Sequence, residues 1–424
     1  MTLRGTQQTS GVTTAIPTTV DNTAREVVQR MLWCTKVKPG VNDFSFDCYH
    51  SLATSSQTSL SDGSSRRAYS SDGTFGHRCK ESEDDDFFRA YLQYSQASHM
   101  GVLDPGYKIF TSQRGYGSLL YTIRNRTLVV SGNPLCPPHH FRPLLEELRQ
   151  FRTANCWRIA FMGVSRTFAE HSQKQGWLVL PFGRERVINP TTNEVLQNKC
   201  ASKRMASQNR QLLDSKRGGI TLGIYAPGIN GIELERESEL QTIYDDWREE
   251  RNCKKRGNLQ TFVTVFDLFS RRDITFFIYT RDREERINGF AALRTLGASS
   301  GFHLDPCIAS SSAPRGITDL LVITAMKLLR GPGVSYLSLG YEPFLDLSKV
   351  PDKDCATARL AREVYRRVVD SAQLRGKKPY NDKFRPDEEL SSGLYIVFPG
   401  GTSLLQQAVA VMHVANIKIR RLFV

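Results

Sequence analysis

The stretch ITFFIYTRDREERINGFAALRTL, residues 274–296, decides how the second half of this chain folds. Two apolar runs rich in β-branched and aromatic residues flank the charged segment 281–286, which is the pattern of a β-hairpin. GFHLD at 301–305 predicts a third strand, and GITDLLVITAMKLL at 316–329 has the apolar spacing of a helix. A further strand is predicted at 335–340. We therefore expect antiparallel strands, then a helix, then one more strand.

The first half of the chain has a similar order of elements. SLLYTIRNRTLVVSG at 118–132 predicts two strands, and HFRPLLEELRQF at 140–151 predicts a helix. WRIAFMGV at 157–164 and WLVLP at 177–181 predict two more strands with another helix between them. The expected fold class is α/β (α+β), with two tandem lobes whose mixed, largely antiparallel sheets are flanked by helices.

The composition divides the chain into four regions. Residues 1–85 are rich in Ser, Thr, Gly and Asp, so we expect a largely disordered segment with one short helix near 24–33. The first lobe is expected at 86–218 and the second at 219–400. The apolar spacing within 401–424 predicts a C-terminal amphipathic helix.

Charge and cysteine usage narrow the function classes. The 424 residues carry a formal net charge of +14, which favours polyanionic partners, either nucleic acid or an anionic membrane surface. No apolar run approaches the roughly 18 residues needed to cross a bilayer, and the N-terminus has no apolar signal core. The nine cysteines include no C-x-x-C pair, so we expect reduced thiols. These features predict a cytoplasmic protein.

Six short motifs occur in one order along the chain. They are GNPLCPP at 132–138, NKCASKRMASQN at 198–209, Trp247 in IYDDWREE, LDPCIASSSAPRG at 304–316, LGYEPF at 339–344 and KFRP at 383–386. Over roughly residues 88–400 this set resembles the aminoacyl-tRNA-dependent lipid aminoacyltransferases, whose bacterial members form the C-terminal domain of phosphatidylglycerol lysyltransferase. In detail it is most similar to the stand-alone fungal members of the ergosteryl-glycine synthase type.

The resemblance implies two N-acetyltransferase-like lobes with the active site in the second. It also implies a transesterification in which a lipid hydroxyl takes the amino acid from aminoacyl-tRNA, a co-substrate, with neither ATP nor a cofactor. For the fungal type, the amino acid would be glycine and the acceptor the 3-hydroxyl of ergosterol. The implied partners are aminoacyl-tRNA and a membrane sterol or lipid, with peripheral membrane contact. Nothing in the sequence indicates an oligomeric state.

Two residues are candidates for catalysis. Asp305 ends a predicted strand, where its carboxylate could hold the substrate's α-ammonium or relay the hydroxyl proton; the alternative is a turn cap with Pro306. Lys383, beside Phe384, could contact the tRNA terminal phosphates or the oxyanion; the alternative is a solvated surface lysine.

Further cations are candidates for binding the tRNA backbone. Lys199, Lys203, Arg204 and Arg210 lie on one predicted helix, and several share a face. The alternative is a solvated basic face. Where bacterial family members read D-L-M-R, this chain has Ile308 in place of the arginine, and Arg315 is the nearest cation that could substitute. A sterol acceptor needs fewer polar contacts than a phosphatidylglycerol head group.

Other interpretations stay open. The acceptor could be another lipid, such as phosphatidylglycerol. An acyl-CoA-dependent N-acyltransferase fits the order of elements, but ASSSAPRGIT at 309–318 has one glycine, unlike a pyrophosphate-binding loop. The third alternative is a non-catalytic module that binds tRNA or a membrane. His139 and His140 have no ligand-spaced partner, so we expect no metal. The helix in 401–424 could dock on anionic lipid through Lys418, Arg420 and Arg421, or pack against the second lobe.

Overall fold

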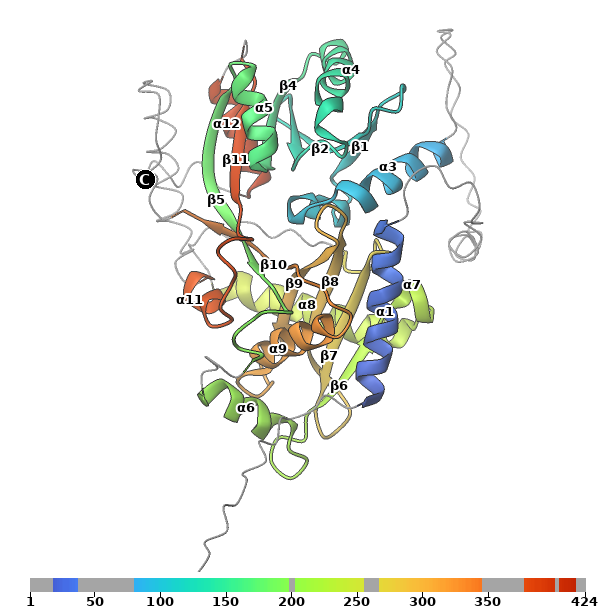
Figure 1. Cartoon of the computed structure of the whole chain (residues 1–424), viewed down its shortest axis with the longest axis vertical. Helices are drawn as coiled ribbons and strands as arrows, with labels where there is room; N and C mark the ends of the chain where they lie inside the picture. Colours follow the sequence, from blue (N-terminus) through green and yellow to red (C-terminus); the bar gives the residue numbers. More distant parts are fainter. Residues whose placement is uncertain are drawn as a thin grey trace, which may run out of the picture.

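The computed structural model describes residues 18–36, 80–197, 203–254, 267–344, 377–400 and 404–416. Within these residues, eleven strands form one sheet in the order β1-β2-β3-β4-β11-β5-β10-β9-β8-β7-β6 (Figure 1). The strands are β1 (Lys108–Thr111), β2 (Ser118–Arg124), β3 (Thr127–Ser131), β4 (Arg158–Val164), β5 (Leu178–Ile188), β6 (Thr221–Tyr225), β7 (Thr275–Arg281), β8 (Ile287–Leu296), β9 (Gly301–Ala309), β10 (Leu337–Pro343) and β11 (Gly393–Phe398).

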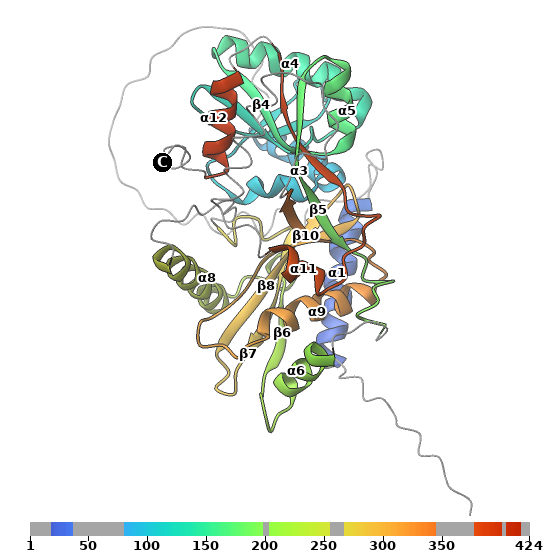
Figure 2. The same cartoon turned by 90° about the vertical axis from the view of Figure 1, so that its left-hand side faces the viewer.

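Helices cover both faces of this sheet (Figure 2). They are α1 (Thr18–Lys36), α3 (Lys80–Tyr94), α4 (Phe141–Ala154), α5 (Arg166–Lys174), α6 (Lys203–Leu213), α7 (Pro227–Asn230), α8 (Leu234–Lys254), α9 (Ile317–Arg330), α11 (Lys377–Asp382) and α12 (Leu404–Val414), with the short 3-10 helices η2 (Ala97–Leu103) and η3 (Pro138–His140). The expected fold class, mixed α/β (α+β) with helices flanking the strands, is confirmed.

The hairpin of β7 and β8 is apolar throughout because both of its faces are buried. Along β7, Phe276 and Ile278 pack in the cluster that contains α9. Phe277 and Tyr279 alternate with them and pack with Leu240 and other residues of α8 on the opposite face. The two helices therefore cover β7–β9 from opposite sides.

The first half of the sheet is layered in the same way. α4 and α5 cover one face with a core that includes Phe141, Leu144 and Phe168. On the other face lie η2 and α12, both of which contact β2, β3 and β4. The apolar stripe of α12 is buried there through Ala410 and Val411. Of the two roles proposed for the C-terminal helix, the described part thus has packing contacts, but with the first half rather than the second; Lys418, Arg420 and Arg421 lie outside the described residues.

The two halves are joined through β5. Its first part pairs with β11, which inserts beside β4, and its last part pairs with β10 from Gly183 to Ile188. The sequence predicted this strand only to Pro181, because the segment that continues it, Arg184-Glu185-Arg186, is charged. The boundary drawn at residue 400 misses this exchange, since Gly393–Phe398 belongs to the first half of the sheet. One continuous sheet replaces the two that were expected.

The helix expected near 24–33 forms as α1 and packs on α9 and β6. Ala24, Val27, Val28 and Met31 are buried in the same core as α9. Of the rest of the segment 1–85, which was expected to be disordered, residues 80–85 are helical because they begin α3, and the other residues lie outside the described part of the chain. No helix in the described part of the chain is long and apolar enough to cross a membrane.

Candidate active site

The parallel strand pairs of the two halves differ in length. In the first half, β3 and β4 pair along Thr127–Ser131, with Arg158–Met162 as partners. In the second half, β9 and β10 pair only where Leu337 and Ser338 meet Phe302 and His303. Beyond this point both strands continue, but the ladder between them ends. Backbone pairing therefore leaves the second half open at the carboxyl end of β9.

Asp305 lies on β9, just beyond the end of this ladder, and is partly buried. Its negative charge acts on Tyr244 of α8, where it adds to the burial that raises the pKa of that phenol. The same charge acts on the thiol of Cys307, two residues further on. Asp305 therefore sits between α8 and the end of the strand pair.

Cys307 follows Asp305 on β9 and contacts the start of α9. Its Sγ lies 3.6 Å from the carbonyl oxygen of Thr318, at the start of α9. Burial raises the pKa of the thiol strongly, and the carboxylates of Asp319 and Asp305 raise it further. A thiol held neutral in this way is a poor nucleophile, so Cys307 is unsuited to carry an acyl group.

Lys383 pairs with an acidic residue that sequence reasoning missed. Its Nζ donates to both carboxylate oxygens of Asp319, at 3.0 Å each, and lies 4.5 Å from the ring centroid of Tyr380. The lysine side chain is 43% exposed and that of Asp319 only 14%. Asp319 is in the first turn of α9, where a carboxylate is favoured by the helix dipole.

Cys307 connects Asp305 with the Asp319–Lys383 pair. Burial has the largest effect on the pKa of its thiol, and the charges of Asp319, the partner of Lys383, and of Asp305 both raise it further. Tyr380 belongs to the same group, since its pKa is raised by burial and then by Cys307 and Asp319. The fold therefore gathers residues from β9, α9 and α11.

Phe384 has a different place from the one expected. Its side chain is completely buried in the core with α9 and meets the ring of Tyr380 edge-on at 5.5 Å. Asn193 Nδ2 donates to the carbonyl oxygens of Phe384 and Arg385 at 2.9 and 3.0 Å. Phe384 therefore anchors the Lys-Phe-Arg-Pro corner and offers no surface to a tRNA in this structure.

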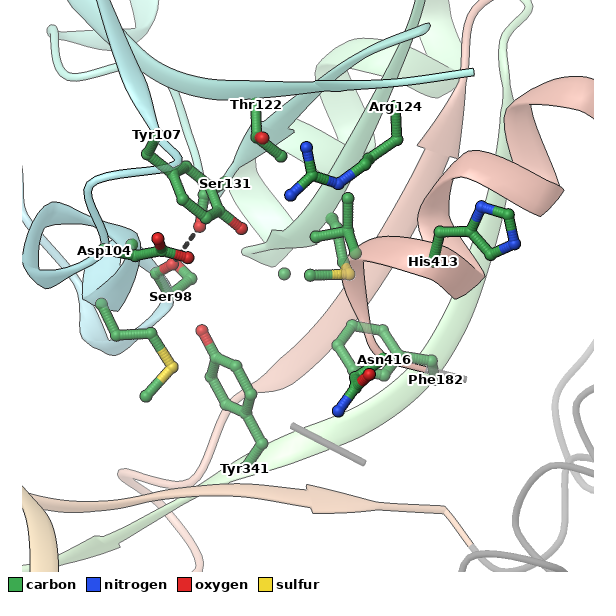
Figure 3. Close-up of a pocket in the computed structure, with 15 residues that line it drawn as sticks. Ser98, Asp104, Tyr107, Thr122, Arg124, Ser131, Phe182, Tyr341, His413 and Asn416 are labelled. Carbon is green, nitrogen blue, oxygen red and sulfur yellow. Dashed lines mark hydrogen bonds between the residues drawn. The ribbon is translucent and has the colours of Figure 1, made fainter. Parts of the chain in front are cut away.

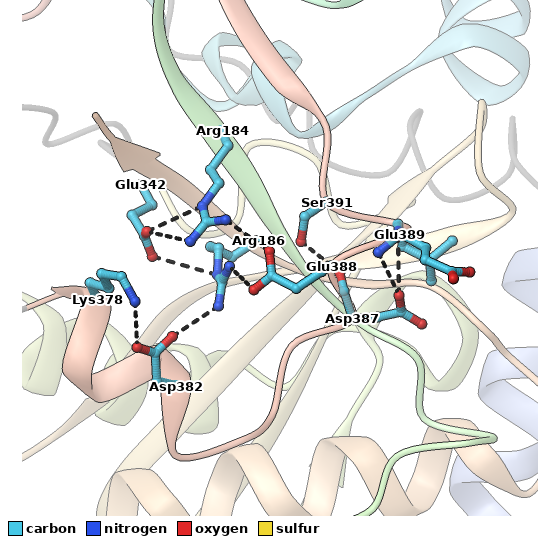
Figure 4. Close-up of polar contacts among 10 residues, drawn as sticks. Arg184, Arg186, Glu342, Lys378, Asp382, Asp387, Glu388, Glu389 and Ser391 are labelled. Carbon is cyan, nitrogen blue, oxygen red and sulfur yellow. Dashed lines mark hydrogen bonds and ion pairs between the residues drawn. The ribbon is translucent and has the colours of Figure 1, made fainter. Parts of the chain in front are cut away.

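A group of charged residues holds this corner against the sheet (Figure 4). Arg186 of β5, with a side chain only 2% exposed, reaches Asp382 at 2.9 Å, Glu388 at 2.7 Å and Glu342 at 3.5 Å. Arg184 pairs with Glu342 and Glu388 in addition. These ion pairs connect β5, β10 and the two ends of the corner.

Not all of the cations predicted to bind tRNA lie within the described part of the chain. Lys203, Arg204 and Arg210 are exposed on α6, whereas Lys199 lies outside the described residues. Gln208 of α6 donates to the carbonyl oxygen of Arg315 at 2.6 Å, and Arg315 is itself exposed. α6 is therefore docked beside the start of α9, four residues from Asp319.

Position 308 holds a core residue. Ile308 is 3% exposed and packs with Phe290 and Tyr244 in the cluster beneath α8. A side chain buried in this way offers no positive charge, so position 308 does not supply the cation that the resemblance implied. Among the described residues, no three His, Cys, Asp or Glu side chains are placed to hold a metal ion. His140 instead pairs through Nδ1 with the carbonyl oxygen of Tyr116 at 3.2 Å.

This fold is that of the lysylphosphatidylglycerol synthase domains. The structure of L-PGS from Bacillus licheniformis has a TM-score of 0.62 at 19% identity and covers 81% of this chain and 98% of that chain. The C-terminal domain of a putative lysylphosphatidylglycerol synthetase from Agrobacterium fabrum has a TM-score of 0.59 at 19% identity, covering 78% of this chain and 96% of its own.

Similarity in sequence extends to curated proteins. An MprF-like domain protein of Mycobacterium tuberculosis is 26% identical over 241 residues, which are 56% of this chain and 48% of the relative. The lysylphosphatidylglycerol biosynthesis bifunctional protein LysX of Rhodococcus jostii is 23% identical over 230 residues, 54% of this chain and 20% of that protein. The match thus spans less than half of either relative. The family model described as phosphatidylglycerol lysyltransferase, C-terminal, matches residues 88–395, and the chain belongs to this family.

Proposed function

We propose that this protein transfers an amino acid from aminoacyl-tRNA to a lipid hydroxyl. The observation that carries the proposal is the position of Asp305 at the open strand pair, with Cys307 beside the start of α9, where the Asp319–Lys383 pair lies, in a chain of the phosphatidylglycerol lysyltransferase C-terminal family. Relatives named for lysylphosphatidylglycerol biosynthesis support this class of reaction.

The reaction exchanges one ester for another. The lipid hydroxyl oxygen attacks the ester carbonyl carbon, the bond from that carbon to the ribose oxygen breaks, and the hydroxyl proton ends on the released ribose hydroxyl. No ATP or cofactor is needed, because the aminoacyl ester is already activated. Catalysis then depends on positioning the two substrates and on stabilising the oxyanion of the tetrahedral intermediate.

The residues of the site divide these tasks. Asp305 either holds the α-ammonium of the aminoacyl group or relays the hydroxyl proton. Lys383 supplies a positive charge for the oxyanion or for the terminal phosphates of the tRNA, and Asp319 orients it. The raised pKa of Cys307 argues against a thioester intermediate, so transfer is direct. In this proposal the exposed cations of α6, together with Arg315, contact the tRNA backbone.

For the acceptor we propose a sterol, and for the amino acid glycine. The support for the sterol is position 308, where an apolar core residue stands in place of a cation that would suit an anionic head group. Phosphatidylglycerol is the alternative acceptor, which the relatives' names favour. The glycine assignment rests on similarity to the fungal members of the family.

The test uses the purified full chain, tRNAs charged with labelled glycine, lysine, alanine or aspartate, and liposomes that contain either ergosterol or phosphatidylglycerol. Labelled amino acid should appear in the lipid extract without ATP, and ribonuclease should abolish the transfer. Label in phosphatidylglycerol alone would replace the sterol proposal. Ribonuclease-resistant transfer, or acylation supported by acetyl-CoA alone, would overturn the reaction class.

A further inference from the structure

A cavity of about 260 Å³ lies in the first half of the molecule (Figure 3), and neither Asp305 nor Lys383 lines it. Its walls come from η2, from β2, β3 and β4, from single residues of β5 and β10, and from α12. The polar residues that line it include Ser98, Asp104, Tyr107, Arg124, Tyr341 and Asn416. None of its lining residues belongs to the candidate active site, so the cavity needs a separate explanation.

The inner wall presents two buried hydroxyl groups, those of Ser98 and Tyr341. Neither has a hydrogen-bond partner at ordinary distance and angle, but the two lie near enough to each other for Ser98 to oppose the rise in the pKa of Tyr341 that burial causes. Both lie beside Gly163, where an added Cβ would be 3.1 Å from Ser98 Cβ and 3.4 Å from the Tyr341 hydroxyl. Buried polar groups are rarely left unpaired, because their desolvation is then uncompensated. These hydroxyls are suited to a polar group bound in the cavity.

Opposite charges stand on different sides of the same cavity. Arg124 enters it from the end of β2, and Asp104 from the turn after η2 (Figure 3). Both charges act on Tyr107: its pKa is raised to about 12, mainly by burial and then by Asp104, while Ser131 and Arg124 oppose the rise. Arg124 uses Nη1 to bond the Ile123 carbonyl oxygen, and a guanidinium has further N–H donors to offer.

We propose that this cavity binds a small zwitterion. Its anionic group pairs with Arg124, its ammonium with Asp104, and the hydroxyls of Ser98 and Tyr341 bond to its polar atoms. Apolar lining from Met162, Phe182 and Val414 would contact an aliphatic portion. A free α-amino acid and a phosphoethanolamine head group share this chemistry. The site is independent of the proposed transfer reaction, because a free carboxylate is not an activated ester.

Binding at this site is coupled to α12. His413, Val414 and Asn416 close one side of the cavity, and Asn125 Nδ2 lies 2.9 Å from His413 Nδ1, which ties the helix to the β2–β3 turn. A ligand held between these walls favours the docked helix, because it binds only when both walls are in place. Occupancy should therefore slow amide hydrogen exchange in Leu404–Val414.

The experiment measures binding to the full chain by calorimetry and thermal shift, without tRNA or lipid transfer. The probes are glycine, alanine, leucine, lysine and O-phosphoethanolamine, with amino-acid methyl esters, N-acetyl amino acids and inorganic phosphate as non-zwitterionic probes. We expect at least one zwitterion to bind at least tenfold more tightly than its ester and its N-acetyl form. Tighter binding of an amino acid would indicate a free metabolite as the ligand, and tighter binding of O-phosphoethanolamine would indicate a lipid head group.

Variants separate this site from nonspecific binding. Arg124→Gln and Asp104→Asn should each weaken the zwitterion at least tenfold, and Tyr341→Phe should weaken it several-fold without lowering the melting temperature. Arg142→Gln, at an exposed arginine of α4 outside the cavity, should leave affinity unchanged. No binding of any zwitterion at 10 mM probe, on the order of a weak metabolite site, would overturn the proposal. Equal affinity in Arg124→Gln, or phosphate binding as tightly as the zwitterions, would overturn it too.

Discussion

The guanidinium of Arg186 lies 2.9 Å from the carboxylate of Asp382, the residue directly before Lys383. The same guanidinium reaches Glu388 at 2.7 Å, so one buried arginine of the central strand holds both ends of the corner that carries Lys383. The position of Lys383 is therefore set from β5 as well as from its own partner, Asp319. Because β5 also pairs with β11 and β10, this contact connects the candidate site to both halves of the sheet.

Replacing Arg186 by Met should both destabilise the protein and displace Lys383. Removing one partner of a fully buried ion pair typically costs about 3–5 kcal/mol. The cost here should be smaller, because Asp382 and Glu388 are 41% and 64% exposed and Glu342 keeps its pair with Arg184. We expect a lower free energy of unfolding in urea and a fall in kcat larger than the change in KM, because a misplaced Lys383 mainly affects the transition state. Arg186→Lys should restore little, since one ammonium cannot replace the forked contacts.

The matched control for this variant is Arg184→Met. Arg184 is on the same strand and shares Glu342 and Glu388, but its side chain is 26% exposed and makes no ion pair with Asp382 among the described residues. Its loss should therefore cost less stability and less activity. If the two variants have equal kcat, or if Arg186→Lys is fully active, Arg186 does not position the corner.

The Lys383 side chain should matter to transfer far more than a lysine one turn away. Lys383→Ala is expected to lower turnover by on the order of a hundredfold or more, as for a charge that acts in the transition state. Lys378→Ala is the control, since Lys378 is 46% exposed and pairs with Asp382 at 2.7 Å, compared with 43% exposure and a 3.0 Å pair for Lys383.

Asp319→Asn tests whether the partner orients this lysine. The amide cannot pair with the ammonium as a carboxylate does, so turnover should fall, but less than in Lys383→Ala. In the double variant the two losses should not add, because both act on one interaction. Additive losses would mean that Asp319 and Lys383 act separately.

Asp305→Asn should abolish most of the transfer while the fold survives. The amide is nearly isosteric, but it carries no negative charge for an α-ammonium and is not a base, so we expect turnover to fall by on the order of a hundredfold or more. Asp245→Asn, at an exposed position of α8, is the control. Filter binding of charged tRNA and the melting temperature should be near normal in both variants. Near-normal turnover in Asp305→Asn would move the site elsewhere.

The elements with strong periodicity were predictable from the sequence. The hairpin at 274–296, the helix that follows it and the strand–turn–strand at 118–132 all form where expected, since each has a long apolar pattern bounded by charged or turn residues. In the turn between the two strands of 118–132, Asn125 and Arg126 both have positive φ. Local sequence is enough for such elements because the residues that form them are close in the chain.

The exchange of strands between the halves was not predictable in the same way. The pairing of β11 with β4 joins residues more than two hundred positions apart, and no local pattern in GLYIVF specifies its partner. The network of Arg186 was missed for a related reason: a charged strand segment indicates exposure until its acidic partners are brought in from elsewhere. Asp319 was overlooked because an acidic residue in the first turn of a helix already has a structural explanation.

His99 should make the stability of the protein fall in mild acid. It is completely buried in η2, where Nδ1 accepts from the backbone N–H of Gln96 and Nε2 donates to the carbonyl oxygen of Asn133, both at 2.9 Å. The pKa of this imidazole is lowered from 6.5 to about 4, mainly by burial and in addition by the charge of Arg294, while the hydrogen bonds to Asn133 and Gln96 oppose the shift. The neutral ring is therefore the form that fits the fold.

The direction in which stability changes with pH follows from the number of protons that the folded and unfolded states bind. Between pH 6.5 and about 4 the unfolded chain protonates this histidine and the folded chain does not. The contribution of His99 to stability is thus complete above pH 6.5 and falls as the pH approaches 4, by about 3 kcal/mol in total.

His99→Gln should be less stable at pH 7, since it disturbs the two hydrogen bonds, but should lose less stability on acidification. Urea unfolding at pH 7.0, 6.0, 5.5 and 5.0 measures the difference, and His139→Gln, at an exposed position, is the control. Carboxylates contribute equally to all three proteins, so parallel curves for the wild type and His99→Gln would show that the buried imidazole does not set this pH dependence.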